Sequence, residues 1–136
     1  MSASLAVQKA IRGRLVATPA VTLLVPSGSI LDRNALPAPD PSIIIGEDQL
    51  VDEGRLARNV VRVFSTLHIW KKELGTTGVK AIADAVRIAL RSASLPTTDG
   101  CQFGDCYVSG TRVLRDPDGE TAHGVVTVET LVSEAL

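Results

Sequence analysis

The chain has 136 residues, of which 45% are hydrophobic and only 3% aromatic, and its formal net charge is −1. This length predicts one domain spanning residues 1–136, large enough to bury a core without a metal or a disulfide. The balanced charge excludes general attraction to nucleic acid or to an anionic membrane. The longest apolar runs are far shorter than the roughly 20 residues of a transmembrane helix, and the charged N-terminal pattern is unlike a signal peptide. We therefore expect a soluble protein made inside the cell.

Residues 4–17 have the apolar spacing of an amphipathic helix, which Pro19 ends. The next stretch, residues 19–41, holds five of the seven prolines and shows no sustained period. It is interpreted as a connection, with one short strand near Ile30 and Leu31.

Two strands are predicted next, at residues 41–49 and 60–71. The residues between them are polar, and we expect a long charged loop that extends from Asp48 to Asn59. Hairpins that only reverse the chain usually have much shorter loops, so this length suggests a contact with another molecule.

A second amphipathic helix is predicted within residues 75–94, with Thr76 or Thr77 as its N-cap. Strands at about residues 105–115 and 121–132 follow, joined by a turn containing Pro117 and Gly119. This order predicts an α+β fold, in which two helices cover one face of a four-stranded antiparallel sheet.

Two helices leave the other face of such a sheet uncovered. The strand at residues 60–71 places Arg62, Phe64, Thr66, His68 and Trp70 on that face. Val125 and Leu131 of the last strand extend the apolar part of this surface. We expect a protein partner to cover it, and the alternative is that residues 19–41 fold back over it.

Patterns typical of enzymes are weak. The segment "GTTGVK" lacks the spacing of a phosphate loop, and no Gly-x-Ser-x-Gly motif is present. The acidic residues at 47–53 lack the order of a calcium loop. A zinc site would need the two histidines and the two cysteines together, namely His68, His123, Cys101 and Cys106. We expect instead two reduced, partly buried thiols on opposite faces of a strand, and no cofactor.

Two other functions remain open at this point. Trp70 beside Lys71 and Lys72 would suit a small nucleic-acid-binding module. A small hydrolase with its site near His123 is the third hypothesis.

Five segments in order carry a family resemblance: "VQKAIRGRLVATPAVTLLV", "SIIIGED", "LHIW", "GVKAIADAVRIAL" and "VLRDPDGETAHGVVTVETL". The chain resembles the tail-completion or tail-terminator proteins of siphovirus-like particles, including those of prophages and gene transfer agents. The resemblance implies a non-enzymatic α+β subunit without a cofactor, made in the bacterial cytoplasm. Such subunits close into a ring, typically a homohexamer, which caps the tail tube, stops its polymerisation and joins the tail to the head.

The resemblance also implies the partners: further copies of the chain, the tail tube protein, the head–tail connector or stopper protein and, as an additional contact, the tape-measure protein. DNA would pass through the lumen of the ring without specific binding. Combined with the uncovered sheet face and the charged loop, this predicts an interface formed by Asp48, Asp52, Glu53, Arg55, Arg58, Arg62, Phe64, His68 and Trp70.

Overall fold

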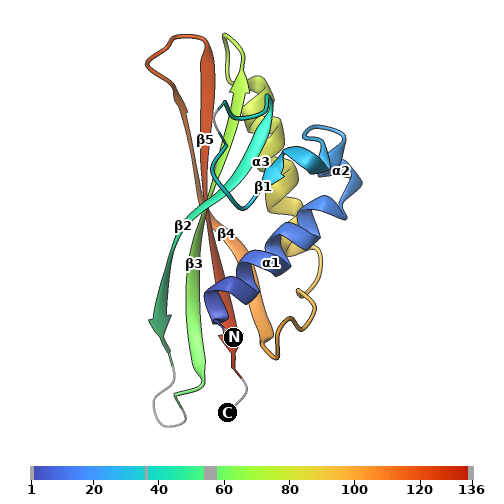
Figure 1. Ribbon diagram of the computed structural model, residues 1–136, viewed down its shortest axis with the longest axis vertical. Helices are drawn as coiled ribbons and strands as arrows, with labels where there is room; N and C mark the ends of the chain where they lie inside the picture. Colours follow the sequence, from blue (N-terminus) through green and yellow to red (C-terminus); the bar gives the residue numbers. More distant parts are fainter. Residues whose placement is uncertain (1, 36, 54–57, 135–136) are drawn as a thin grey trace.

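The computed structural model describes residues 2–35, 37–53 and 58–134, and Figure 1 shows their arrangement. Its helices are α1 (Ala3–Val16), α2 (Pro19–Thr22) and α3 (Thr77–Arg91). Its strands are β1 (Ile30–Leu31), β2 (Ser42–Asp52), β3 (Val60–Lys72), β4 (Gln102–Arg115) and β5 (Thr121–Ser133), in the sheet order β1-β2-β3-β5-β4.

The α+β class is confirmed, but the prediction of four antiparallel strands is wrong. The fifth strand, β1, pairs parallel to β2, with Ile30 opposite Ile43 and Leu31 opposite Ile44. Both β1 residues are buried, so this two-residue strand completes the core at the sheet edge. The short helix α2 is also additional, and it begins with Pro19, whose fixed φ suits a first helical position.

The helices α1 and α3 pack on one face of the sheet (Figure 1). Burial in β3 consequently alternates residue by residue, with Val61, Val63, Leu67 and Ile69 buried and their neighbours half-buried. The same alternation occurs along β5. The predicted division of the sheet into a helix-covered face and an uncovered face is therefore correct.

The position of the N-cap of α3 is as predicted, but the group that accepts its hydrogen bond is different. Thr76 is the N-cap, but its side chain makes no capping hydrogen bond. The backbone N–H of Gly78 instead donates to Oε1 of Glu73, at 3.0 Å. A carboxylate from the preceding turn thus accepts a hydrogen bond from one of the free N–H groups at the N-terminus of the helix, where negative charge is also favoured by the helix dipole.

The other end of α3 is held by α1. The guanidinium of Arg14 donates hydrogen bonds to the backbone oxygens of Ala89, Ala93 and Ser94 at 2.9–3.0 Å. One side chain therefore satisfies three carbonyl groups where the helix ends.

The hairpin of β2 and β3 is longer than predicted, and its loop is shorter. Asp48 is opposite Ser65 and Asp52 is opposite Val61, so the first part of the predicted charged loop is strand. A bulge between Ile45 and Asp48 shifts the register. Every described residue from Gly46 to Glu53 is exposed, because β2 continues past the helices (Figure 1).

Both cysteines are free and buried, whereas the sequence placed them on opposite faces of a strand. A bulge between Phe103 and Cys106 restores Cys106 to the helix-covered face. Burial raises the pKa of the Cys106 thiol, which accepts a hydrogen bond from Thr130.

Two glycines test the packing of α1 and α3 on the sheet. A Cβ at Gly124 would lie 2.8 Å from Cγ1 of Val79, whereas one at Gly13 in α1 would meet nothing within 4 Å. We predict that Gly124→Ala lowers the free energy of unfolding by about 1–3 kcal/mol through overpacking. Gly13→Ala should raise it by about 0.5–1 kcal/mol through helix propensity. Urea denaturation measures both, and equal effects of the two changes would contradict the packing described here.

Candidate interaction surface

The uncovered side of the sheet, here called the open face, carries side chains from four strands. They alternate with the buried positions and are brought together by the antiparallel register. The open face comprises Ile44, Gln49, Val51, Arg62, Phe64, Thr66, His68, Trp70, Tyr107, Arg112, Leu114, His123, Val125, Thr127, Glu129 and Leu131.

A cluster of aromatic and ionisable side chains lies near one end of the open face. Nδ1 of His68 is 2.9 Å from Nε2 of His123, and Nε2 of His68 is 2.8 Å from Oε1 of Glu47. The ring of His123 stacks on Trp70, with centroids 3.7 Å apart and an angle of 8° between the rings. Gly46 permits this arrangement, because a Cβ there would lie 2.9 Å from Cδ2 of His68.

The hydrogen bonds define how the neutral histidines are protonated. A carboxylate only accepts, so Nε2 of His68 donates to Glu47 and Nδ1 accepts from Nε2–H of His123. Burial, and then the charge of His68, lower the pKa of His123 below its ordinary value. The hydrogen bond from His68 lowers the pKa of Glu47.

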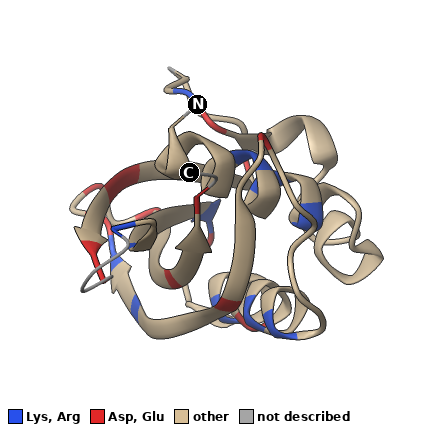
Figure 2. Cartoon of the chain, turned by 90° about the horizontal axis from the view of Figure 1, so that it is seen from below, with Lys and Arg blue, Asp and Glu red and all other residues tan. Residues whose placement is uncertain are grey.

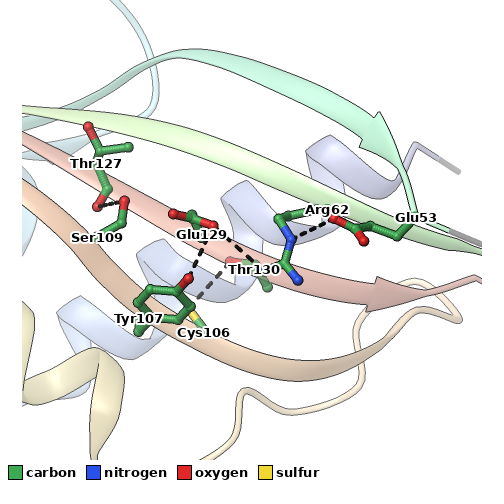
Figure 3. Close-up of polar contacts among 8 residues, drawn as sticks. All are labelled: Glu53, Arg62, Cys106, Tyr107, Ser109, Thr127, Glu129 and Thr130. Atoms are coloured by element: carbon green, nitrogen blue, oxygen red, sulfur yellow. Dashed lines mark hydrogen bonds and ion pairs between the residues drawn. The ribbon is translucent and has the colours of Figure 1, made fainter.

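A second polar cluster crosses the open face nearer the hairpin of β2 and β3 (Figure 3). The hydroxyl of Tyr107 donates to Glu129 at 3.1 Å, and Nη1 of Arg62 lies 3.7 Å from the same carboxylate oxygen. Nε of Arg62 also donates to Oε1 of Glu53 at 2.8 Å, which raises the pKa of Arg62. The side chains of Arg62 and Glu129 are only 25% and 19% exposed. Three strands and Glu53, the residue that follows β2, are thus linked by one partly shielded network.

The predicted interface residues fall into three groups. The open face brings together Arg62, Phe64, His68 and Trp70, and Glu53 joins them through Arg62. Asp48 and Asp52 lie on the opposite face of β2, at exposed positions beyond the helices. Arg58 is exposed just before β3, and Arg55 lies outside the described residues.

The sequence did not indicate Tyr107, Glu129 and the contact of His123 with His68. Tyr107 and Glu129 do follow the two-residue period of their strands. Their contact depends on the pairing of β4 with β5, and a bulge between Val108 and Gly110 makes that register irregular.

The Pro-rich segment does reach one end of the open face. Pro37–Asp40 and Trp70 line a cavity of about 390 Å³. Oδ1 of Asp40 accepts a hydrogen bond from the backbone N–H of Lys72 at 2.9 Å. A second cavity of about 500 Å³ lies between Asp32–Asn34 and His68. Within the described chain, the fold-back is thus found at Trp70, while Phe64 stays half-exposed.

The alternatives for chemistry find little support. The cysteines lie under the helices and the histidines on the open face, so the four residues do not form a zinc site. Across residues 2–35, 37–53 and 58–134, no group of three His, Cys, Asp or Glu side chains is arranged to hold a metal. Among the helices of these residues, none is long and apolar enough to cross a bilayer.

The proposed nucleic-acid site at Trp70 has mixed charge. Lys71 and Lys72 share their cavity with Asp40, Asp116 and Asp118. The N-terminus of α3 is likewise occupied by Glu73, which leaves no positive site for a phosphate at Gly78.

The histidine pair predicts a pH dependence of stability. Because the pKa of His123 is lowered in the folded state, the unfolded chain binds this proton more readily. The free energy of unfolding should therefore fall as the pH drops through about 6.5, before the carboxylates titrate. Replacement His123→Gln should flatten the profile between about pH 4.5 and 6.5, measured by denaturation at each pH. An unchanged profile in the variant would contradict this assignment.

Comparison with known proteins identifies the family and the fold. Residues 9–133 match the family described as tail completion protein gp17. The fold is similar to a chain in the virion of a native gene transfer agent particle, with a TM-score of 0.85 and 18% identity over 98% of this chain and 99% of that one. It is also similar to the gp17 protein of bacteriophage SPP1, with a TM-score of 0.64 and 21% identity over 94% and 89% of the two chains.

No curated protein matches the sequence. The family match nevertheless spans almost the whole chain, and both structural similarities cover it nearly completely. The chain belongs to the gp17 family of tail completion proteins, and it is a structural protein of the virion tail.

Proposed function

We propose that this protein is a tail terminator: copies close into a ring, typically of six, at the end of the tail tube. The ring stops polymerisation of the tube and presents a docking surface to the head–tail connector. Membership of the gp17 family supports a structural role in the tail. The observation that carries the ring is the open face, which the helices of the same chain leave uncovered.

The open face has the composition of a surface that becomes buried. Phe64, Trp70, Val125 and Leu131 are half-exposed on neighbouring strands. Burying a large apolar side chain stabilises a contact by roughly 1.5–3 kcal/mol, and a continuous apolar patch on a free protein favours aggregation. Contact with other copies or with tail components would bury this apolar surface and so prevent aggregation.

The polar network among these apolar residues would give the contact its orientation. Arg62 lies between two carboxylates, Glu53 and Glu129, and is already partly shielded from water. A neighbour in the wrong register would cover this network without matching its charges, so the network favours one register. In a closed ring each copy uses one surface to contact a different surface of the next copy.

The proposed partners are those that the family resemblance implies. Besides further copies, they are the tail tube protein, the connector or stopper protein and, as an additional contact, the tape-measure protein. DNA passes through the lumen without specific binding. The interface residues proposed are those of the open face, Arg62, Phe64, His68 and Trp70, together with Asp48, Asp52, Glu53, Arg55 and Arg58 of the hairpin.

Phe64 provides the test of this proposal. Phe64→Ala removes half-exposed apolar surface without altering the buried side of β3, so it should weaken assembly about tenfold or more at unchanged circular dichroism. Light scattering coupled to size-exclusion chromatography, over a range of concentrations, measures the mass. Ile88→Ala is the matched control, because Ile88 is 43% exposed on α3, away from the open face. Equal masses for the Phe64 variant and the control would contradict a role of the open face in the ring.

A further inference from the structure

The sheet has two edges that the described chain leaves partly unpaired. β4 pairs only with β5, and β1 pairs with β2 only at Ile43 and Ile44. In the described part of the chain, residues 48–52 therefore pair with β3 on one side and with no strand on the other. This segment is called the free edge of β2.

Exposed strand edges are usually protected, because their unpaired N–H and C=O groups recruit other strands. Lys and Pro are the common protecting residues, and neither occurs in residues 42–53 or 102–115. Each strand does contain a β-bulge and charged residues, which also limit unspecific pairing, so a partner strand has to match both the charge and the register of the edge.

The two edges carry opposite charges. Residues 42–53 include four acidic residues and no basic one: Glu47, Asp48, Asp52 and Glu53. Residues 102–115, which form β4, include two basic residues, Arg112 and Arg115, and one acidic residue, Asp105, so that β4 has a net charge of opposite sign. Figure 2 shows the acidic end of β2 in red beside the grey residues. Charge complementarity therefore favours β4 of a second copy as the occupant of the free edge.

The strand directions agree with this pairing. β2, β3, β5 and β4 are successively antiparallel, so β2 and β4 run in opposite directions. A rotation about an axis near the strand direction would bring β4 of one copy antiparallel to β2 of the next.

Side-chain direction then limits the register. On the helix-covered side, β2 presents Asp48 and Leu50, and β4 presents Val113 and Arg115. Placing Asp48 opposite Arg115 also places Leu50 opposite Val113, so that an ion pair and an apolar pair form together. A shift by two residues would instead place Arg115 opposite Leu50.

This register has a plausible geometry for a closed sheet. In the register of the sheet, Asp48 is opposite Ser65 of β3, which is opposite Val128 of β5. Arg115 is opposite Ala122 of β5, six residues before Val128. Six residues amount to about 20 Å along the strands, and β2, β3, β5 and β4 together span about 19 Å. The resulting tilt is about 45°, at the upper end of the range for closed barrels.

We propose that the free edge of β2 pairs antiparallel with β4 of a second copy, with Asp48 opposite Arg115 and Leu50 opposite Val113. The inference rests on the proposed ring and specifies how its neighbours are joined. The sheets of successive copies then form one continuous sheet around the ring.

A cysteine pair tests the register directly. The same alignment places Val51 opposite Arg112 on the open face, whereas β3 and β5 separate these residues within one copy. Val51→Cys combined with Arg112→Cys should form disulfide-linked multimers under mild oxidation, seen as a ladder on a non-reducing gel. The matched control is Val51→Cys with Thr111→Cys, whose side chains would point to opposite faces. The control should cross-link at less than about a tenth of that yield, since disulfides tolerate little displacement.

A charge exchange gives an independent test. Asp48→Arg and Arg115→Asp should each weaken assembly about tenfold or more, and the double variant should restore it, as measured by light scattering. Rings that form without the cross-link would overturn the edge pairing and leave the proposed function intact. A chain that stays monomeric at all concentrations would overturn both.

Discussion

The structure depends on covering one side of a twisted sheet with a single layer of helices. The core on that side consists mainly of small and branched residues, and α3 lies so close that only glycine fits at position 124 beneath Val79. The carbonyl groups at the end of α3 are held by Arg14, so α1 and α3 are fixed to each other as well as to the sheet. This layer has no counterpart on the other side among the described elements, and that asymmetry leaves the open face available.

Edge pairing would join successive copies into one sheet, and the open faces, all on the same side of that sheet, would then contact tail components. Phe64 and Leu131 supply apolar area for a contact, whereas the charges of Arg62, Glu53 and Glu129 would fix the orientation of the partner. Edge pairing would add backbone hydrogen bonds that are independent of side-chain identity.

The sequence predicted the faces of β3 and β5, because a two-residue period directly reports one-sided burial. It indicated the short strand at Ile30 and Leu31 but not its parallel pairing with β2, since two residues carry no period, and it did not predict the extension of β2, where acidic residues resembled a loop. The strand persists there because β3 provides a long partner. The contacts of Tyr107 with Glu129 and of His68 with His123 depend on register, which bulges alter and which composition does not encode.

The hairpin of β2 with β3 and the turn between β4 and β5 lie at opposite ends of the molecule (Figure 1). The turn at residues 116–120 contains three carboxylates and no basic residue, whereas Arg58 and Glu53 of opposite sign flank the far hairpin. An annulus built with its strands near the axis would therefore have two chemically unlike rims. Each rim of such a ring would suit a different neighbour in the particle, so the ring would be inserted in only one orientation.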